Sequence, residues 1–77
     1  MANIALSLLK VNEAGTITEI SGGCHARKRL YELGLNRGTR VKMIKNDIGP
    51  VILNLSGHKL ALGKGLANKI IVNKIVS

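Results

Sequence analysis

Short stretches in which apolar and polar residues alternate dominate this chain. Val41 and Met43 lie on either side of Lys42, and Val51–Leu55 carries an aliphatic side chain at every second position. Alternation with a period of two predicts strands that have one buried and one solvated face. Stretches with this alternation, or with strand-forming branched residues, are Thr16–Ile20, Thr39–Lys45, Val51–Leu55, Lys59–Leu62 and Ile70–Val76.

The N-terminal part predicts a hairpin-like unit. The apolar segment Leu6–Val11 precedes a turn-like Asn12–Gly15, and Thr16–Ile20 then has strand propensity. Near the other end of the chain, Leu66–Lys69 is expected to form a single helical turn before the last strand. Glycine, asparagine and proline mark the remaining breaks, which fall at Ser21–Gly23, Asn36–Gly38, Asn46–Pro50, Ser56–Gly57 and Gly63–Gly65.

One segment changes from strand spacing to helix spacing. Ala26, Leu30 and Leu33 lie at i, i+4 and i+7, which places them on one face of a helix. Gly34 can adopt the left-handed conformation that ends a helix, and Leu35 can supply the hydrophobic contact that accompanies such a cap. The other faces of this amphipathic helix carry charged residues: Arg27, Lys28, Arg29 and Glu32.

These elements predict a mainly β protein: five or six short strands with one inserted α-helix, closed into a small, partly open barrel over residues 1–77 as a single domain. A barrel is favoured because curling the sheet leaves few open edges in a chain of 77 residues. Composition agrees, since the apolar residues are mostly branched aliphatics and nine glycines supply turns.

Net charge and cysteine content indicate the kind of partner and the cellular compartment. The formal charge is +8, so the surface attracts acidic partners. The single cysteine, Cys24, excludes an internal disulfide framework, and we expect a cytoplasmic protein. No apolar run approaches the roughly 20 residues that cross a bilayer. The segment Ile4–Leu9 has no basic flank before it and no evident cleavage site after it, so we expect folded chain rather than a signal peptide.

Candidate chemistry is sparse. Thiolate and imidazole suit ferrous iron or zinc, which makes Cys24, His25 and His58, with Asp47, the one metal hypothesis, but their spacing does not resemble a ligand set. The sequence therefore favours no metal and no cofactor. No phosphate-loop motif is present, and the carboxylates Glu13, Glu19, Glu32 and Asp47 are scattered without a nearby histidine, so we expect no enzyme.

The residues from Arg29 to Val41 follow the spacing R-L-x-x-L-G-L-x-x-G-x-x-V, and Gly22–Gly23 precede them. This pattern resembles the signature of the FeoA family. The resemblance extends over nearly the whole chain through Leu6–Lys10, Gly57–Leu62 and the final isoleucine-rich strand, and departs from the family pattern at Gly63–Leu66, which is less acidic.

The resemblance implies an SH3-like barrel related to the C-terminal domain of DtxR-type metal-dependent repressors. It also implies a non-enzymatic accessory role in ferrous iron uptake, through binding to the cytoplasmic side of the FeoB transporter, whose N-terminal part is a GTP-binding domain. An arginine finger acting on that domain would come from Arg27, Arg29 or Arg37. The residues that we expect to contact this partner are on the exposed face of the helix and its exit loop: Arg27, Lys28, Tyr31, Asn36 and Arg37.

Two alternatives remain open. A small basic barrel also suits non-specific binding of nucleic acid, because lysine and arginine contact phosphates. Sequence-selective recognition usually adds aromatic stacking, and Tyr31 is the only aromatic residue. The other alternative is a role at a membrane surface.

Overall fold

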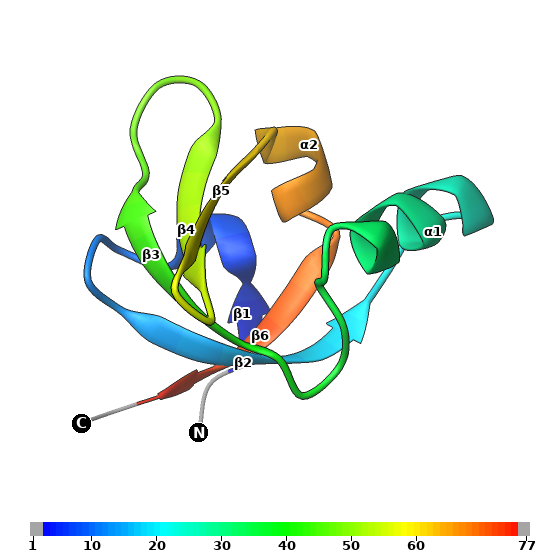
Figure 1. Cartoon of the computed structure of the whole chain (residues 1–77), viewed down its shortest axis with the longest axis horizontal. Coiled ribbons are helices and arrows are strands. Elements are labelled where there is room, and N and C mark those ends of the chain that lie inside the picture. Colours follow the sequence, from blue (N-terminus) through cyan, green and yellow to red (C-terminus); the bar gives the residue numbers. More distant parts are fainter. Residues whose placement is uncertain (1–2, 76–77) are drawn as a thin grey trace.

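The computed structural model describes residues 3–75, which form six strands, two α-helices and one short 3-10 helix (Figure 1). In chain order the elements are β1 (Asn3–Ala5), η1 (Leu6–Leu8), β2 (Ala14–Ile20), α1 (Cys24–Glu32), β3 (Arg40–Lys45), β4 (Val51–Leu55), β5 (His58–Leu62), α2 (Lys64–Ala67) and β6 (Ile70–Ile75). The predicted last strand is confirmed over Ile70–Ile75, whereas Val76 lies outside the described residues.

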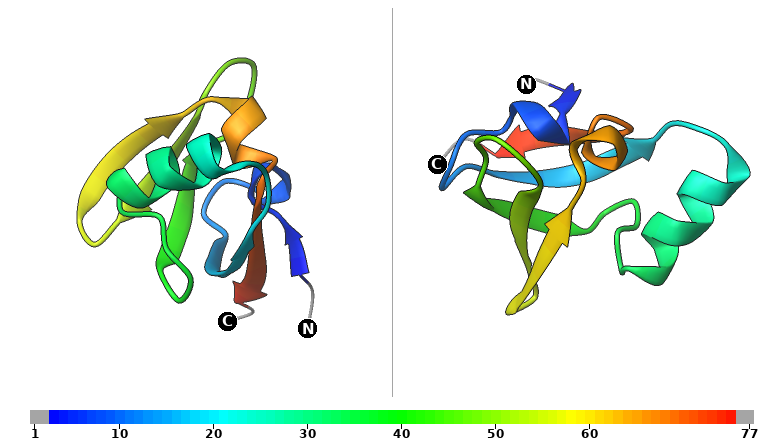
Figure 2. Two further views of the ribbon diagram at one scale, coloured as in Figure 1. Left: turned by 90° about the vertical axis from the view of Figure 1, so that its right-hand side faces the viewer. Right: turned by 90° about the horizontal axis from the view of Figure 1, so that it is seen from above.

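The six strands form one antiparallel sheet in the order β1-β6-β2-β3-β4-β5. The sheet curls strongly, as the views of Figure 2 show, and β1 and β5 are its two edges. These edges do not pair with each other in the described sheet, so the barrel is partly open. The predicted mainly β class is confirmed.

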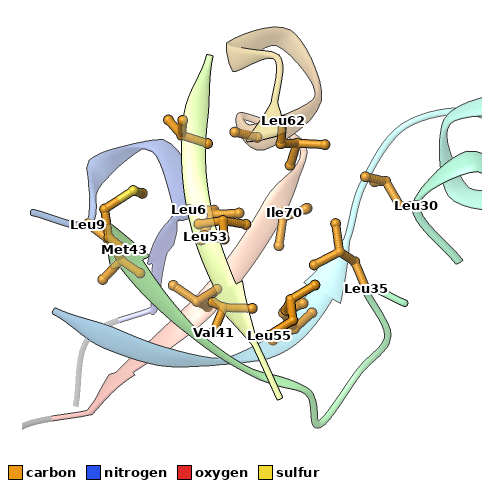
Figure 3. Packing of buried hydrophobic residues seen from close by; sticks show 14 of the residues in the cluster. Leu6, Leu9, Leu30, Leu35, Val41, Met43, Leu53, Leu55, Leu62 and Ile70 are labelled. Atoms are coloured by element: carbon orange, nitrogen blue, oxygen red, sulfur yellow. The ribbon is translucent and has the colours of Figure 1, made fainter. Parts of the chain in front are cut away.

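The predicted alternation decides which side chains enter the barrel. Val41 and Met43 of β3 are buried while Lys42 between them is exposed. Side chains from the central strands meet inside the barrel, together with leucines from η1 and from the C-terminal end of α1 (Figure 3). The buried hydrophobic residues are Leu6, Leu9, Ile17, Ile20, Leu30, Leu35, Val41, Met43, Val51, Leu53, Leu55, Leu62, Ala67, Ile70 and Val72.

The predicted N-terminal hairpin is wrong. β1 pairs with β6 through Asn3↔Asn73, and β2 pairs with β6 and β3. The segment between β1 and β2 contains the 3-10 turn η1. Leu6 and Leu9, which are three positions apart in this segment, are both fully buried. Burial of these two leucines explains the 3-10 turn, because it directs both side chains into the core where a continuous strand would direct them to opposite faces.

The predicted turn at Asn12–Gly15 is also partly wrong, because Ala14 and Gly15 belong to β2. Asn12 makes the turn with a φ of 72°. Gly15 serves close packing: a Cβ there would lie 3.0 Å from Val72 Cγ2, so any larger residue would push β2 away from β6.

The predicted helical turn before the last strand is present but begins earlier, at Lys64 rather than Leu66. The Gly63 carbonyl accepts hydrogen bonds from the N–H groups of Leu66 and Ala67 at 3.1 and 3.0 Å. Ala67 is fully buried, so its packing fixes the register of this turn, which propensity alone did not reveal.

Candidate functional site

Helix α1 stands beside the barrel and not within its sheet (Figures 1 and 2). Leu30 is its one buried residue, and Ala26 is half-buried on the same face. The predicted apolar stripe is therefore confirmed, with Leu33 half-buried just after the helix. The rest of the helix faces solvent, including its basic residues.

The end of α1 is fixed as the sequence predicted. Gly34 has a φ of 87°, and its N–H donates to the Tyr31 carbonyl at 3.0 Å. The Leu35 N–H donates to the Leu30 carbonyl at 2.9 Å, which completes a Schellman motif. Leu30 and Leu35 are both fully buried and lie near each other in Figure 3. This cap therefore turns the chain back onto the barrel and sets the course of the exit loop.

A hollow of about 300 Å³ lies between the helix, the end of β2 and the exit loop. Its lining consists of Glu19, Ile20, Arg27, Tyr31 and Arg37. Three of the five residues predicted to contact a partner thus come together, although Arg27 and Arg37 are ten positions apart in sequence. The Schellman turn makes this possible because it reverses the chain between them.

The hollow is positively charged and carries an aromatic side chain. Arg27 and Arg37 contribute two guanidinium groups against the single carboxylate of Glu19. Neither arginine forms an ion pair within residues 3–75. The ion pair found among these residues joins Lys74 to Glu13 at 2.5 Å and lies outside the hollow. The Tyr31 side chain is 65% exposed. The donors of the hollow are therefore available to an acidic partner.

The other two predicted residues lie outside this lining. Lys28 is exposed on α1. Asn36 is half-buried: its N–H donates to Thr39 Oγ1 at 3.3 Å, and its carbonyl accepts from the Thr39 N–H at 3.0 Å. The Asn36 Oδ1 atom is buried without a hydrogen-bond partner among the described residues. Asn36 thus shapes the exit loop.

Sequence reasoning missed Glu19 and Ile20 as neighbours of the helix residues. Both lie at the end of β2, directly before the Ser21–Gly23 break that leads into α1. Their position next to that break was the available signal, because a chain that reverses at a break brings its two flanks together. The distance between the flanks depends on how the barrel is packed, which sequence spacing does not give.

The residues of the metal hypothesis are not brought together. Cys24 is exposed at the start of α1, whereas His58 begins β5 and Asp47 lies in the β3–β4 loop. In the part of the chain from 3 to 75, no three side chains of His, Cys, Asp or Glu are placed to hold a metal ion. None of the helices within that part is long and apolar enough to cross a membrane.

Comparison with known proteins identifies relatives over almost the entire chain. The FeoA domain family model matches residues 4–74. A Methanocaldococcus jannaschii protein named "Putative Fe(2+) transport protein A" is 42% identical over 67 residues, which cover 87% of this chain and 82% of that protein.

Solved structures agree with this match. The crystal structure of an iron uptake regulatory protein (FeoA) superposes with a TM-score of 0.92 at 32% identity, covering 96% of this chain and 100% of the other. A manganese-dependent transcriptional repressor in complex with manganese superposes with a TM-score of 0.90 at 19% identity, covering 97% of this chain and 38% of the repressor, and shares the fold alone. The predicted SH3-like barrel is confirmed, and the chain belongs to the FeoA family.

Proposed function

We propose that this protein is a non-enzymatic, cytoplasmic accessory protein of ferrous iron uptake that binds the cytoplasmic GTP-binding part of a FeoB-type transporter. Membership of the FeoA family and the name of the Methanocaldococcus jannaschii relative support a role in iron transport. The observation that carries the docking proposal is the hollow beside α1, which gathers Arg27, Tyr31 and Arg37 at the surface.

The chemistry of the hollow suits an acidic side chain of the partner. A guanidinium group can bind a carboxylate through two parallel N–H···O hydrogen bonds, and such charge-assisted pairs are stronger than neutral ones. Arginine and tyrosine are also, with tryptophan, the residues enriched at energetically dominant positions of protein interfaces. A carboxylate of the partner that enters between Arg27 and Arg37 would contact both guanidinium groups and the Tyr31 side chain. The carboxylate of Glu19 reduces the net positive charge of the hollow.

The exposed lysine and the exit loop complete this surface. Lys28 is exposed on the same helix and adds to the positive potential that speeds encounter with an acidic surface. Asn36 supports the loop that holds Arg37, because its N–H donates to Thr39 Oγ1 and its carbonyl accepts from the Thr39 N–H. In this proposal Arg27, Tyr31 and Arg37 make the contact, Lys28 steers, and Asn36 keeps the loop in place.

The test is direct binding of the full chain to the purified cytoplasmic part of the transporter at low salt. The double variant Arg27→Glu with Lys28→Glu, called the helix pair, should weaken binding at least about tenfold, because it reverses charges at the contact. The matched control is Lys42→Glu with Lys59→Glu, called the sheet pair, which makes the same change of net charge on strands β3 and β5. The sheet pair should change affinity less than about threefold.

Equal weakening by both pairs would contradict the proposed surface, because it would indicate attraction by net charge alone. Absence of any association at low salt, where steering is strongest, would contradict the partner. Tyr31→Phe and Tyr31→Ala then separate the ring from its hydroxyl, since an interface that uses the aromatic face tolerates the first and not the second.

The proposal also specifies contact without catalysis. An arginine finger raises GTP turnover by about 10³ or more. We expect the partner's GTP turnover to change less than about tenfold on addition of this protein. A larger increase that is lost in Arg27→Ala or Arg37→Ala would contradict the non-enzymatic role.

A further inference from the structure

A second basic surface lies on the outer side of β3, β4 and β5. The register pairs Lys42 with Asn54 and Asn54 with Lys59, so these three side chains form one row across the strands. Met43 and Leu53 are paired and buried, so the row next to them points away from the core. Lys42 and Lys59 therefore lie on the outside of the barrel, on either side of Asn54.

A bulge extends this surface along β3. The register shifts between Met43 and Lys45, where Ile44 is the extra residue. Without the shift, Lys45 would point the same way as Met43, into the core. With it, Lys45 pairs with Ile52 and is exposed. We call the exposed basic residues on this outer side the sheet face: Arg40, Lys42, Lys45 and Lys59.

The charge of the sheet face is not compensated. Strands β3, β4 and β5 contain no Asp or Glu, and the nearest carboxylate in sequence is Asp47 in the β3–β4 loop. None of the four basic residues forms an ion pair within residues 3–75. A hollow of about 510 Å³ at one end of this face is lined in part by Arg40, Lys42, Asn54 and Ser56, which offer cationic and polar groups to an anion.

Exposed aliphatic side chains lie near the opposite end of the same hairpin. Ile48, in the β3–β4 loop, is 98% exposed, and this loop projects from the barrel in Figure 1. Asn46 Nδ2 donates to the carbonyls of Ser7 and Leu9 at 2.9 and 2.6 Å, which ties the loop to η1. Leu8, between these two carbonyls, is 66% exposed. Two large apolar side chains therefore face solvent on segments that Asn46 ties together, Ile48 in the loop and Leu8 in η1.

We propose that the sheet face and the β3–β4 loop bind the surface of an anionic lipid bilayer. Lysine and arginine near such a surface are attracted to its negative headgroups, and apolar side chains beside them enter the headgroup boundary. The combination distinguishes lipid from nucleic acid: phosphate contacts would use the basic residues but not an exposed isoleucine, and the sheet face offers no aromatic side chain for stacking.

The proposed lipid-binding surface consists of other residues than the proposed contact with the transporter. In Figure 1 the β3–β4 loop and helix α1 lie at different ends of the molecule. One surface can therefore rest on the bilayer while α1 faces a protein partner. Confinement to the membrane plane would raise the effective concentration of the protein near a membrane-embedded transporter.

The test is co-sedimentation of the full chain with vesicles of phosphatidylcholine alone and of phosphatidylcholine with about one third phosphatidylglycerol, at low and physiological salt. Each basic residue near an anionic surface contributes about fivefold to binding. The sheet pair, Lys42→Glu with Lys59→Glu, should therefore lower binding to the anionic vesicles at least about tenfold. Ile48→Ser should weaken the binding that persists at physiological salt, because that part depends on apolar insertion.

The helix pair is the matched control, because it lowers the net charge equally on α1. It should change vesicle binding less than about threefold, while circular dichroism verifies that both pairs are folded. Equal loss with both pairs, or equal binding to both vesicles, would overturn the inference. So would loss of single-stranded RNA binding in the sheet pair with vesicle binding unchanged, which would assign the face to nucleic acid. Failure here leaves the transporter-binding test unaffected, because that test measures binding to the purified cytoplasmic part of the transporter in the absence of lipid.

Discussion

The barrel and helix α1 are stabilised in different ways. Inside the barrel, the central strands each contribute two or more buried side chains, and η1 adds Leu6. Helix α1 buries only Leu30, and its end is fixed by the Schellman cap at Gly34. We therefore expect the barrel to unfold as a cooperative unit, whereas α1 is an attached element. Most of the outer surface of α1 is not needed for packing and is free to bind a partner.

Removing a core side chain should affect the barrel most. Leu53 lies on β4, between β3 and β5, and is fully buried. Leu53→Ala should lower the free energy of unfolding by about 2–5 kcal/mol. The substitution leaves a cavity, because the neighbouring side chains of β3 and β5 relax only partly into the vacated space. Chemical denaturation measures this loss. A change below about 1 kcal/mol would show that the barrel core is loosely packed.

Removing the helix anchor should have a smaller and local effect. Leu30→Ala should cost about 2 kcal/mol, because the site lies at the margin of the core. Amide hydrogen exchange should then show loss of protection in α1 while β3 and β4 stay protected. Equal loss of protection throughout the chain would contradict the distinction between an attached helix and a cooperative barrel.

Changing the helix cap should have a still smaller effect. Gly34→Ala should destabilise by about 1 kcal/mol, because its φ of 87° strains an L-residue. The matched control is Gly65→Ala inside α2, where an added Cβ meets nothing within 4 Å. That control should raise the free energy of unfolding by up to about 1 kcal/mol, since alanine has a higher helix propensity than glycine. Thermal unfolding of both variants measures the difference in sign.

The smallest effect concerns the ion pair between Glu13, directly before β2, and Lys74 of β6. A hydrogen bond from the Lys74 ammonium, with a second from the Lys10 N–H at 2.7 Å, lowers the pKa of Glu13 below its ordinary 4.5. A lowered folded-state pKa stabilises the protein above pH 4.5 and ceases to do so as pH falls through the folded value. Glu13→Gln should therefore be less stable than the parent at neutral pH, and the difference should vanish in acid. Denaturation across this pH range measures it, and a constant difference would contradict the ion pair.

Local rules determined much of this structure from the sequence. Alternation identified the buried residues of β3 and β4, because a strand directs successive side chains to opposite faces. The spacing of Ala26, Leu30 and Gly34 identified α1 and its end, because a helix cap is a local structure of a few residues. The motif from Arg29 to Val41 identified the family, and with it the SH3-like fold.

The way in which distant segments meet could not be predicted from the sequence. The partner of β1 is β6, at the other end of the chain, and no local signal distinguishes that pairing from a hairpin with β2. The bulge at Ile44 sets the direction of Lys45, and the packing of β2 brings Glu19 to Arg27 and Arg37. Such pairings depend on the total apolar surface that the curled sheet buries, which is a property of all strands together. Strand alternation and helix caps depend on a few neighbouring residues.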